Sequence, residues 1–411
     1  MPDGSPFTLD HLPYAVYHRH GQQGRVGVGI GDHVLDLTVA LDDPTFARPS
    51  LDAFLTQGPG RWREVRDRIT DLLTDDRHLA RLTPALFARQ ALTLVLPFTV
   101  ADYVDFYSSV HHATNVGRMF RPGDDPLQPN WRHLPVAYHG RAGTVVASGT
   151  PIVRPAGQFL DPDTDTPSFG PTRRLDLEAE VGFVVGVGSG PGRPVPVGAM
   201  AEHVFGVVLC NDWSARDIQA WETVPLGPHQ GKSFATSISA WVTPLAALDA
   251  ARAPPPRQDP EPLPYLRGAD DTGLDLTLEV RINGHVVARP PFAGMYWTPA
   301  QQLAHLTVNG AHLRTGDLYA SGTVSGPERD QRGCLLELTW NGAEPLTLPD
   351  GGTRTFLEDR DVVTITATAP GTAGGRIGLG EVTGTVHPAA SPAPVVAEGR
   401  PTGSHEPSPR R

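Results

Sequence analysis

Four acidic residues have a spacing that could gather several carboxylate oxygens at one place. Glu178 and Glu180 lie two positions apart in a segment with strand character, so their side chains point to the same face. Asp105 lies at the expected end of another strand, and Asp212 follows the apolar run 204–210. With no cysteine or histidine pair to favour zinc, this donor set suits a hard cation such as Ca²⁺ or Mg²⁺. The alternative is a solvated acidic edge, because Asp176 shares the face of the two glutamates.

Lys232 is the only lysine among the 34 basic side chains of the protein. An ammonium group is compact and has three rotatable donors, whereas the planar guanidinium of arginine has a fixed fork. The single lysine therefore predicts a small polar pocket in which the charge of Lys232 has a role. The alternative is a surface lysine retained by chance.

His112 is the candidate for acid–base chemistry. The segment from Asp105 to Phe120 reads as the end of a strand that runs into a helix. If Asp105 is helical, His112 lies seven residues further on and shares its face, whereas His111 points about 100° away. The alternatives are that Asp105 caps the helix and that His112 is a core histidine with satisfied hydrogen bonds.

A second candidate face begins at Asp212. Asp212, Arg216, Gln219 and Thr223 follow one another at helical spacing, so one helix face would present a carboxylate, a guanidinium, an amide and a hydroxyl. A surface ion pair between Asp212 and Arg216 is the alternative, and such a pair would contribute little to stability. The preceding apolar run and two nearby tryptophans favour a less exposed location.

The elements that must position these residues are mostly strands. Residues 14–20, 25–30 and 33–37 predict a small N-terminal β unit, and apolar residues between 62 and 73 recur at helical spacing. Residues 274–282 and 285–288 predict a hairpin around Asn283-Gly284, and residues 336–340 before Asn341-Gly342 predict another. No helices alternate regularly with these strands, so we expect a mainly β (α+β) fold rather than a doubly wound parallel sheet. We expect domains at 1–97 and 98–388, and a disordered Pro-rich tail at 389–411.

Composition narrows the possible partners. The net charge is −11 and no basic run precedes Arg410-Arg411, which argues against nucleic acid binding. No apolar run reaches the ~20 residues of a membrane span, and the first residues lack the features of a signal peptide. We therefore expect a cytoplasmic protein without membrane association. Cys210 and Cys334 are too few for a disulfide scaffold and are expected to be buried thiols.

Several longer blocks form a recognisable set when taken with these residues. They include Asp-Phe-Tyr-Ser-Ser from Asp105, Tyr-His-Gly-Arg from Tyr138, Asn-Asp-Trp-Ser-Ala-Arg-Asp-Ile-Gln up to Gln219, Gly-Lys-Ser-Phe around Lys232, and Leu-Glu-Leu-Thr-Trp around Glu337. From about Asp105 to Val386, the chain resembles the fumarylacetoacetate hydrolase family. The resemblance implies an SH3-like N-terminal barrel, a large mixed β-sandwich or roll that carries the catalytic site, and a homodimer.

The resemblance also implies roles for individual residues. Metal ligation maps to Asp105, Glu178, Glu180 and Asp212, and a second cation maps to Asp212, Lys232 and Thr236. His112 maps to the general base and Glu337 to the carboxylate that orients it, with Arg216, Gln219 and Lys232 available to stabilise an oxyanion. Substrate contacts map to Tyr107, Arg121, Tyr138, Arg216, Gln219 and Thr323. Thr223 stands where the family has a tyrosine, which removes a phenolic contact.

The implied activity is metal-dependent hydrolysis of the carbon–carbon bond of fumarylacetoacetate, a β-diketo acid, in the last step of tyrosine and phenylalanine breakdown. Ca²⁺ or Mg²⁺ would be needed, and no organic cofactor. Two alternatives use the same carboxylates: a related acylpyruvate hydrolase or oxo-acid decarboxylase, and a calcium-binding module without enzymatic activity. A water-activating pair of His112 and Glu337 favours the hydrolase, because neither decarboxylation nor metal storage needs one.

Overall fold

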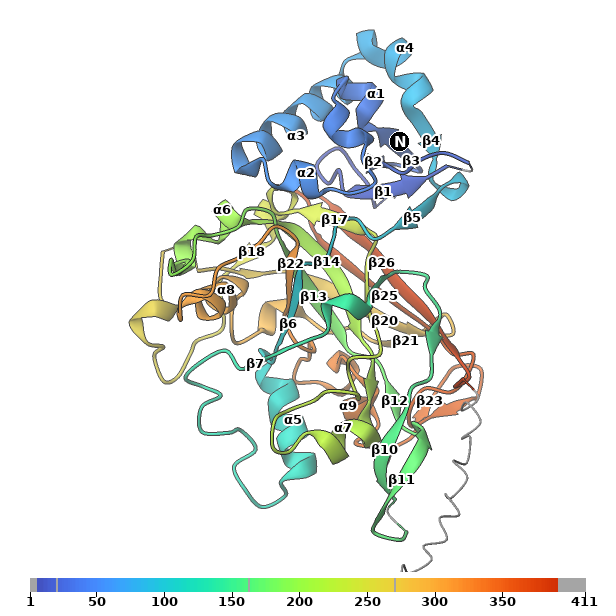
Figure 1. The fold of residues 1–411 in the computed structure, drawn as a ribbon, viewed down its shortest axis with the longest axis vertical. Helices are drawn as coiled ribbons and strands as arrows, with labels where there is room; N and C mark the ends of the chain where they lie inside the picture. The colour runs from blue at the N-terminus through green and yellow to red at the C-terminus, as the bar shows by residue number, and fades with distance from the viewer. Residues whose placement is uncertain (1–5, 20, 162, 270, 391–411) are drawn as a thin grey trace, which may run out of the picture.

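The computed structural model describes residues 6–19, 21–161, 163–269 and 271–390 (Figure 1). Residues 391–411 of the predicted tail lie outside the described residues. Within the described ranges, no helix has the length and apolar character needed to cross a bilayer.

A long mixed sheet runs through the described part of the molecule. Its main path has the order β4-β3-β2-β1-β17-β14-β13-β22-β6-β7, with β5, β8 and β16 attached to its sides. Most neighbours are antiparallel, and β6 pairs with β22 in parallel. The strands are β1 (Tyr14–His18), β2 (Arg25–Ile30), β3 (His33–Asp36), β4 (Leu86–Ala88), β5 (Thr93–Val95), β6 (Asp102–Phe106), β7 (Ala137–His139), β8 (Val145–Ala147), β13 (Ala179–Val185), β14 (Val204–Asp212), β16 (Thr236–Ile238), β17 (Trp241–Pro244) and β22 (Asp317–Ala320).

A second sheet packs beside the first and has the order β21-β20-β25-β26-β9. Its strands are β9 (Ile152–Val153), β20 (Thr277–Ile282), β21 (His285–Ala288), β25 (Val362–Pro370) and β26 (Arg376–His387). Apolar side chains from β13, β14, β20, β25 and β26 form one buried cluster. This cluster is the core of the larger part of the protein, because burial of apolar area is the main force that holds two sheets together.

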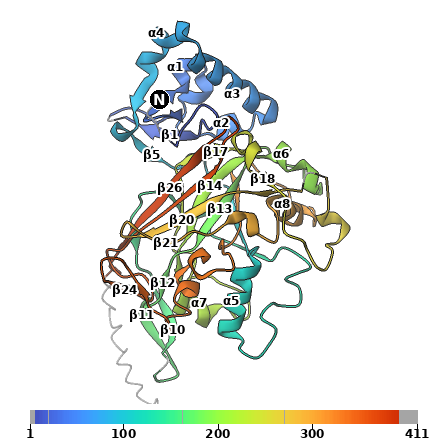
Figure 2. The same ribbon diagram turned by 180° about the vertical axis from the view of Figure 1, so that it is seen from behind.

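Short strand pairs and helices complete the fold. The pairs are β10 (Ala156–Asp161) with β11 (Thr166–Pro171), β12 (Leu175–Asp176) with β15 (Ser214–Ala215), β18 (Arg252–Ala253) with β19 (Gly273–Leu274), and β23 (Leu346–Thr347) with β24 (Thr353–Arg354). The helices are α1 (Leu37–Leu41), α2 (Asp52–Leu55), α3 (Gly58–Thr74), α4 (Leu79–Leu82), α5 (Val110–Phe120), α6 (Met200–His203), α7 (Arg216–Glu222), α8 (Pro299–Thr307) and α9 (Leu335–Leu338). In both views α5 and α7 lie at the end of the molecule away from the N-terminal unit (Figures 1 and 2).

The N-terminal unit consists of β1 to β5 with α1 to α4, shown in blue in Figure 1. It continues into the main sheet because β1 pairs with β17. The predicted helix around Trp62 is α3, which buries Val65, Ile69 and Leu72. Edge-to-face contacts of Phe205 with Phe54 and Trp62 join this unit to β14.

The predicted β-dominated α+β class is confirmed, and so is the hairpin at Asn283-Gly284. Both turn residues have positive φ, 52° and 82°, as a two-residue hairpin turn requires. The second predicted hairpin is wrong. Residues 335–338 form the short helix α9, and Trp340, Asn341 and Gly342 that follow it all have positive φ. The alternating pattern there is overruled by hydrogen bonds from the backbone of α9 to a distant carboxylate, that of Asp176.

Candidate functional site

The register of the main sheet brings the four acidic residues to one place. Asp105 on β6 lies beside Ala320 of β22, and Asp212 ends β14. The backbone N–H of Asp212 donates to the carbonyl oxygen of Glu178, while Glu180 lies opposite Cys210. One carboxylate oxygen from each of the four acids, Asp105, Glu178, Glu180 and Asp212, lies within 4.8 Å of the others. We call these four residues the carboxylate cluster.

The carboxylate cluster is buried, so the solvated acidic edge is wrong. All four residues are at most 4% exposed. Lys232 is 7% exposed, which excludes a chance surface lysine, and its Nζ donates to Asp212 Oδ2 at 2.7 Å and to Glu178 Oε2. Arg216 donates to Glu178 Oε1 at 2.7 Å. Two cations are therefore buried with the four acids.

The cluster has more negative charge than these cations can neutralise. Burial and the charge of Asp212 raise the pKa of Asp105 well above its ordinary value. Burial and the charge of Asp105 raise the pKa of Glu180 in the same way. Burial acts to raise the pKa of Glu178 too, but the charges of Lys232 and Arg216 outweigh it and lower that pKa. The repulsion between like charges therefore acts mainly on Asp105 and Glu180, whose pKa values are both raised.

The unpaired oxygens fit a metal ion. Among the described residues, Asp105 Oδ1 and both carboxylate oxygens of Glu180 are buried without a hydrogen-bond partner. Buried polar atoms are ordinarily paired, because leaving one unpaired costs about 1–3 kcal/mol. A divalent cation would satisfy these oxygens and offset the repulsion between the carboxylates. The carboxylate cluster is therefore a candidate metal site with an all-oxygen donor set.

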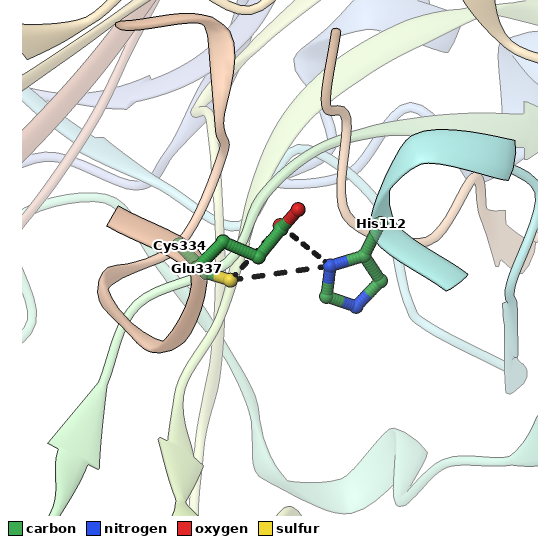
Figure 3. A group of neighbouring side chains, drawn as sticks. All are labelled: His112, Cys334 and Glu337. Carbon is green, nitrogen blue, oxygen red and sulfur yellow. Dashed lines mark hydrogen bonds and ion pairs between the residues drawn. The ribbon is translucent and has the colours of Figure 1, made fainter. Parts of the chain in front are cut away.

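A histidine and a carboxylate form a second buried pair next to the cluster (Figure 3). His112 Nδ1 lies 2.6 Å from Glu337 Oε2, and both residues are at most 3% exposed. Burial acts to raise the pKa of Glu337, but the His112 charge and hydrogen bonds from His112, Asn115 and Ser325 lower it to about 2. Because the carboxylate is ionised, Nδ1 of His112 must carry the proton and donate it.

The other ring nitrogen of His112 is left free to accept a proton. Nε2 lies on the far side of the ring from Glu337, as Figure 3 shows, and 4.0 Å from Glu178 Oε1 of the carboxylate cluster. The edge of the Tyr107 ring packs against the imidazole, with ring centroids 5.3 Å apart. The histidine is thus held by Glu337 on one side and faces the candidate metal site on the other.

His112, Cys334 and Glu337 also have the donor types of a soft-metal site, but their geometry is that of hydrogen bonding. The 2.6 Å from Nδ1 to Oε2 is shorter than the roughly 3.3 Å between two ligands of a tetrahedral zinc ion. Burial and the charge of Glu337 raise the pKa of the Cys334 thiol well above its ordinary value. The thiol therefore keeps its proton and donates to Glu337 Oε2 at 3.2 Å.

Comparison with known proteins gives the chain a family. Residues 10–97 match the description "Fumarylacetoacetase N-terminal", and residues 102–387 match "Fumarylacetoacetate (FAA) hydrolase C-terminal". The chain belongs to the fumarylacetoacetate hydrolase family. It is 46% identical to human fumarylacetoacetase over 416 residues, covering 95% of this chain and 99% of that protein. It is 44% identical to the Arabidopsis thaliana fumarylacetoacetase over 407 residues, covering 93% and 96%.

Solved structures support the same fold at greater evolutionary distance. A fumarylacetoacetate hydrolase from Exiguobacterium antarcticum superposes with a TM-score of 0.55 at 18% identity, covering 92% of this chain and 99% of that one. A maleylpyruvate hydrolase from Sphingobium superposes with a TM-score of 0.51 at 15% identity, covering 92% and 100%. The fumarylacetoacetate hydrolase fold therefore accounts for nearly the whole described chain.

The structure confirms a strand end that runs into a helix for the segment from Asp105 to Phe120, whereas the shared helix face is wrong both for this motif and for the one that begins at Asp212. Asp105 is on β6 and Ser109 caps α5, so Asp105 and His112 share no helix. Asp212 ends β14, and α7 begins only at Arg216. The alternative, a surface ion pair between Asp212 and Arg216, is absent from the ion pairs of the described residues, because Arg216 pairs with Asp176 and Glu178. Residues on strand ends and helix starts converge here where a single helix face was expected.

Other residues expected to contact a substrate lie around the site. Tyr138 donates to Asp212 Oδ2 at 3.0 Å, and Thr236 donates to Asp212 Oδ1 at 2.8 Å. Arg216 also donates to Gln219 Oε1 at 3.2 Å. A cavity of about 200 Å³ reaches Asp212, Lys232 and Thr236 and is lined further by Tyr103, Tyr138, His139, Gly140, Arg141, Pro228, His229 and Ser233. It connects these residues to exposed ones such as Arg141.

Two other residues that the resemblance maps to substrate binding, Arg121 and Thr323, make their recorded contacts away from the carboxylate cluster. Arg121 follows α5 and donates to the carbonyl oxygen of Pro126 at 2.7 Å. Thr323 is buried beyond β22, next to Gly333. The structure records no hydrogen bond of either side chain to the carboxylate cluster or to His112 among the described residues.

Sequence reasoning missed three side chains that hold the histidine and its carboxylate. Asn115 donates to Glu337 Oε1 at 2.8 Å and Ser325 donates to Glu337 Oε2 at 2.7 Å, in addition to the Cys334 thiol. Asn115 lies three residues beyond His112. This spacing puts the two side chains next to each other on a helix, so the sequence contained a signal for Asn115. Cys334 lies three residues before Glu337 and offers a similar local signal, whereas only the fold brings Ser325 to Glu337.

Lys232→Arg is expected to lower kcat about 100-fold or more although it keeps the charge. Lys232 occupies a buried position between Glu178 and Asp212, and a guanidinium there would be larger, planar and differently directed. Burial acts to lower the pKa of Lys232, but the charges of Asp212 and Glu178 outweigh it and raise that pKa. We therefore expect the amine to stay protonated and not to act as a nucleophile. Steady-state kinetics test the first statement. Borohydride reduction with substrate, followed by mass spectrometry, tests the second, and a reduced substrate adduct on Lys232 would contradict it.

Thr223→Tyr is expected to lower KM while leaving the metal content unchanged. Thr223 follows α7, and its hydroxyl donates to the carbonyl oxygen of Gln219 at 2.6 Å. That bond uses its only donor, so the threonine hydroxyl has no donor left for the phenolic contact expected of a tyrosine at this position. Steady-state kinetics and metal analysis of the variant test this. An unchanged KM would mean that position 223 does not face the substrate.

Proposed function

We propose that this protein hydrolyses the carbon–carbon bond of fumarylacetoacetate to give fumarate and acetoacetate. The proposal is supported by relatives named fumarylacetoacetase that are 41–46% identical over nearly their full length. The observation that carries it is the orientation of His112, with Nδ1 hydrogen-bonded to Glu337 and Nε2 facing the carboxylate cluster. This arrangement is what a base that activates water needs.

In the proposed mechanism, Nε2 of His112 takes a proton from water as the water oxygen adds to the fumaroyl carbonyl carbon. Glu337 keeps the other ring nitrogen protonated and stabilises the imidazolium that forms. The tetrahedral intermediate then collapses, and the bond between the former carbonyl carbon and the acetoacetate carbon breaks. The imidazolium returns its proton to that carbon. One water is consumed, and His112 ends in its starting state.

Other residues have proposed roles in binding and in stabilising charge. We assign oxyanion stabilisation to Lys232, Arg216 and Gln219, since Lys232 and Arg216 donate to acids of the carboxylate cluster and Gln219 accepts from Arg216. We assign substrate binding to Tyr107, Arg121, Tyr138, Gln219, Thr223 and Thr323. Arg216 and Lys232 are already engaged by buried acids, so they would have to share their donors with the substrate.

We propose that the metal is Ca²⁺ or Mg²⁺, held by Asp105, Glu178, Glu180 and Asp212. A bound divalent ion would polarise the diketone oxygens and stabilise negative charge on the departing acetoacetate. A second cation would be held by Asp212, Thr236 and the main chain of Lys232. The absence of thiolate and imidazole from the carboxylate cluster argues for a hard ion.

We further propose a division into an N-terminal domain at 1–97 and a catalytic domain at 98–388, and a cytoplasmic homodimer that binds neither nucleic acid nor membrane. Exposed apolar residues support a dimer: Phe169 on β11 is 71% exposed, and Val224 and Leu226 after α7 are 83% and 96% exposed. A partner surface would remove these side chains from water.

The proposal is tested by following the loss of diketone absorbance with fumarylacetoacetate and with a simple acylpyruvate, at equal enzyme and cation concentrations. We expect a higher kcat/KM for fumarylacetoacetate and stoichiometric fumarate. A preference for the acylpyruvate would favour the related hydrolase, and release of CO₂ without fumarate would favour a decarboxylase. Cation binding without turnover of either substrate would favour the remaining alternative, a calcium-binding module without enzymatic activity.

A further inference from the structure

Asp176 is a buried carboxylate that the mechanism above does not use. It ends β12 and is 0% exposed. Its Oδ1 accepts the backbone N–H of Leu335 at 2.7 Å, and its Oδ2 accepts that of Leu336 at 3.0 Å. These are the first two residues of α9, whose own N-cap residue, Cys334, makes no side-chain capping bond. A carboxylate from a distant segment thus caps this helix.

The helix that Asp176 caps carries Glu337. Glu337 is the third residue of α9, so its position depends on how the first turn is held. Two charge-assisted bonds to backbone N–H groups fix that turn more firmly than water would. Asp176 therefore sets where the Glu337 carboxylate meets Nδ1 of His112.

Asp176 also acts on the other side of the histidine. Its Oδ2 accepts from Arg216 Nε at 2.8 Å, and Arg216 donates in turn to Glu178 Oε1 at 2.7 Å. That same oxygen lies 4.0 Å from His112 Nε2. One buried carboxylate is thus linked to both groups between which the imidazole lies.

We propose that Asp176 is a positioning residue that orients His112 through Glu337 on one side and through Arg216 and Glu178 on the other. This inference rests on the proposed hydrolytic function, in which His112 is the base. It assigns no contact between Asp176 and the substrate. Replacing Asp176 should therefore lower kcat and change KM little.

Asp176→Asn tests the proposal, because the amide keeps the shape but loses the charge and one acceptor. We expect kcat to fall roughly 10- to 100-fold, as is typical for residues that orient a catalytic group. Asp361→Asn is the matched control. Asp361 is also buried and also bonds an arginine and a backbone N–H, those of Arg354 and Glu358. The control should lose stability but keep kcat.

A double-mutant cycle separates positioning from a general loss of stability. In a Glu337→Gln background, Asp176→Asn should lower kcat severalfold less than it does in the wild type, because the group it orients is already impaired. Equal effects in the two backgrounds would overturn the proposal, as would a wild-type kcat in Asp176→Asn. If the asparagine variant does not fold, Asp176→Glu, which moves the carboxylate by one methylene, takes its place in the same measurements.

A measurement without substrate keeps this proposal distinct from the proposed function. In protein labelled with ¹⁵N-histidine, the Nδ1–H resonance of His112, assigned by its loss in His112→Ala, reports the bond to Glu337. It should shift in Asp176→Asn and stay in place in Asp361→Asn. An unmoved resonance would overturn the positioning role. A wild-type enzyme that does not turn over fumarylacetoacetate would instead overturn the proposed function while leaving this resonance test intact.

Discussion

Replacing His112 with alanine is expected to lower kcat for fumarylacetoacetate by about 10²- to 10⁴-fold, the range of a lost general base. The variant should still bind its cation, because His112 hydrogen-bonds to Glu337 and does not belong to the carboxylate cluster. KM should change less than kcat, since the lost interaction belongs to the transition state. Steady-state kinetics and metal analysis on the same preparation measure both quantities.

His111→Ala is the matched control for this experiment. His111 precedes His112 on α5 but is only half-buried, and burial lowers its pKa. The structure records no hydrogen bond of its ring to Glu337 or the carboxylate cluster among the described residues. Its replacement should change kcat by less than about threefold, as expected for a side chain outside the reacting group. Equal losses in the two variants would contradict the assignment of the base to His112.

Part of the site was predictable from local patterns of residue type and spacing. The spacing of Glu178 and Glu180 predicts two carboxylates on one face, and the structure buries both in the cluster. The single lysine predicts a small polar pocket, and Lys232 lies between two acids. The period of a strand carried the inference for the two glutamates, and the chemistry of the residue type carried it for Lys232, which lies in a turn.

What failed was the local geometry around Asp105 and Asp212. Asp212 was expected on a helix face, and Asp105 either at a strand end or on a helix face; both lie at or near the ends of strands that lead toward helices. A strand–helix junction can place the same residues together as a helix face does, so the motif predicted proximity for the wrong reason. Helical spacing alone cannot distinguish the two arrangements.

Asp176 shows why a prediction made from one sequence segment at a time can fail. Its alternation with Glu178 indicated a solvated strand edge, but its partners are Arg216 and the backbone of Leu335 and Leu336, the latter two 159 and 160 residues away. The same long-range bonds explain why residues 335–338 are a helix where the sequence predicted a strand. Tertiary contacts overrule a short alternating pattern in both places.

Removing divalent cations is expected to abolish turnover and to lower the melting temperature of the protein. The cation-free cluster leaves Asp105 Oδ1 and both oxygens of Glu180 buried without partners among the described residues. A ligand that binds only the folded state at 100 times its Kd stabilises that state by about 2.7 kcal/mol. Chelated protein should therefore gain several degrees in melting temperature when Ca²⁺ or Mg²⁺ is added, and activity should return over the same concentrations.

Glu180→Gln identifies the site at which the cation acts. The variant removes the charge whose two oxygens lack partners, so it should lose most of the melting-temperature gain on Ca²⁺ addition. Asp361→Asn, whose carboxylate is satisfied by Arg354, Asn283 and the backbone of Glu358, should keep that gain. Full turnover by protein shown to be free of metal would contradict the mechanism. A melting-temperature gain that survives in Glu180→Gln would place the cation elsewhere, because the carboxylate cluster would then not be the group that the ion stabilises.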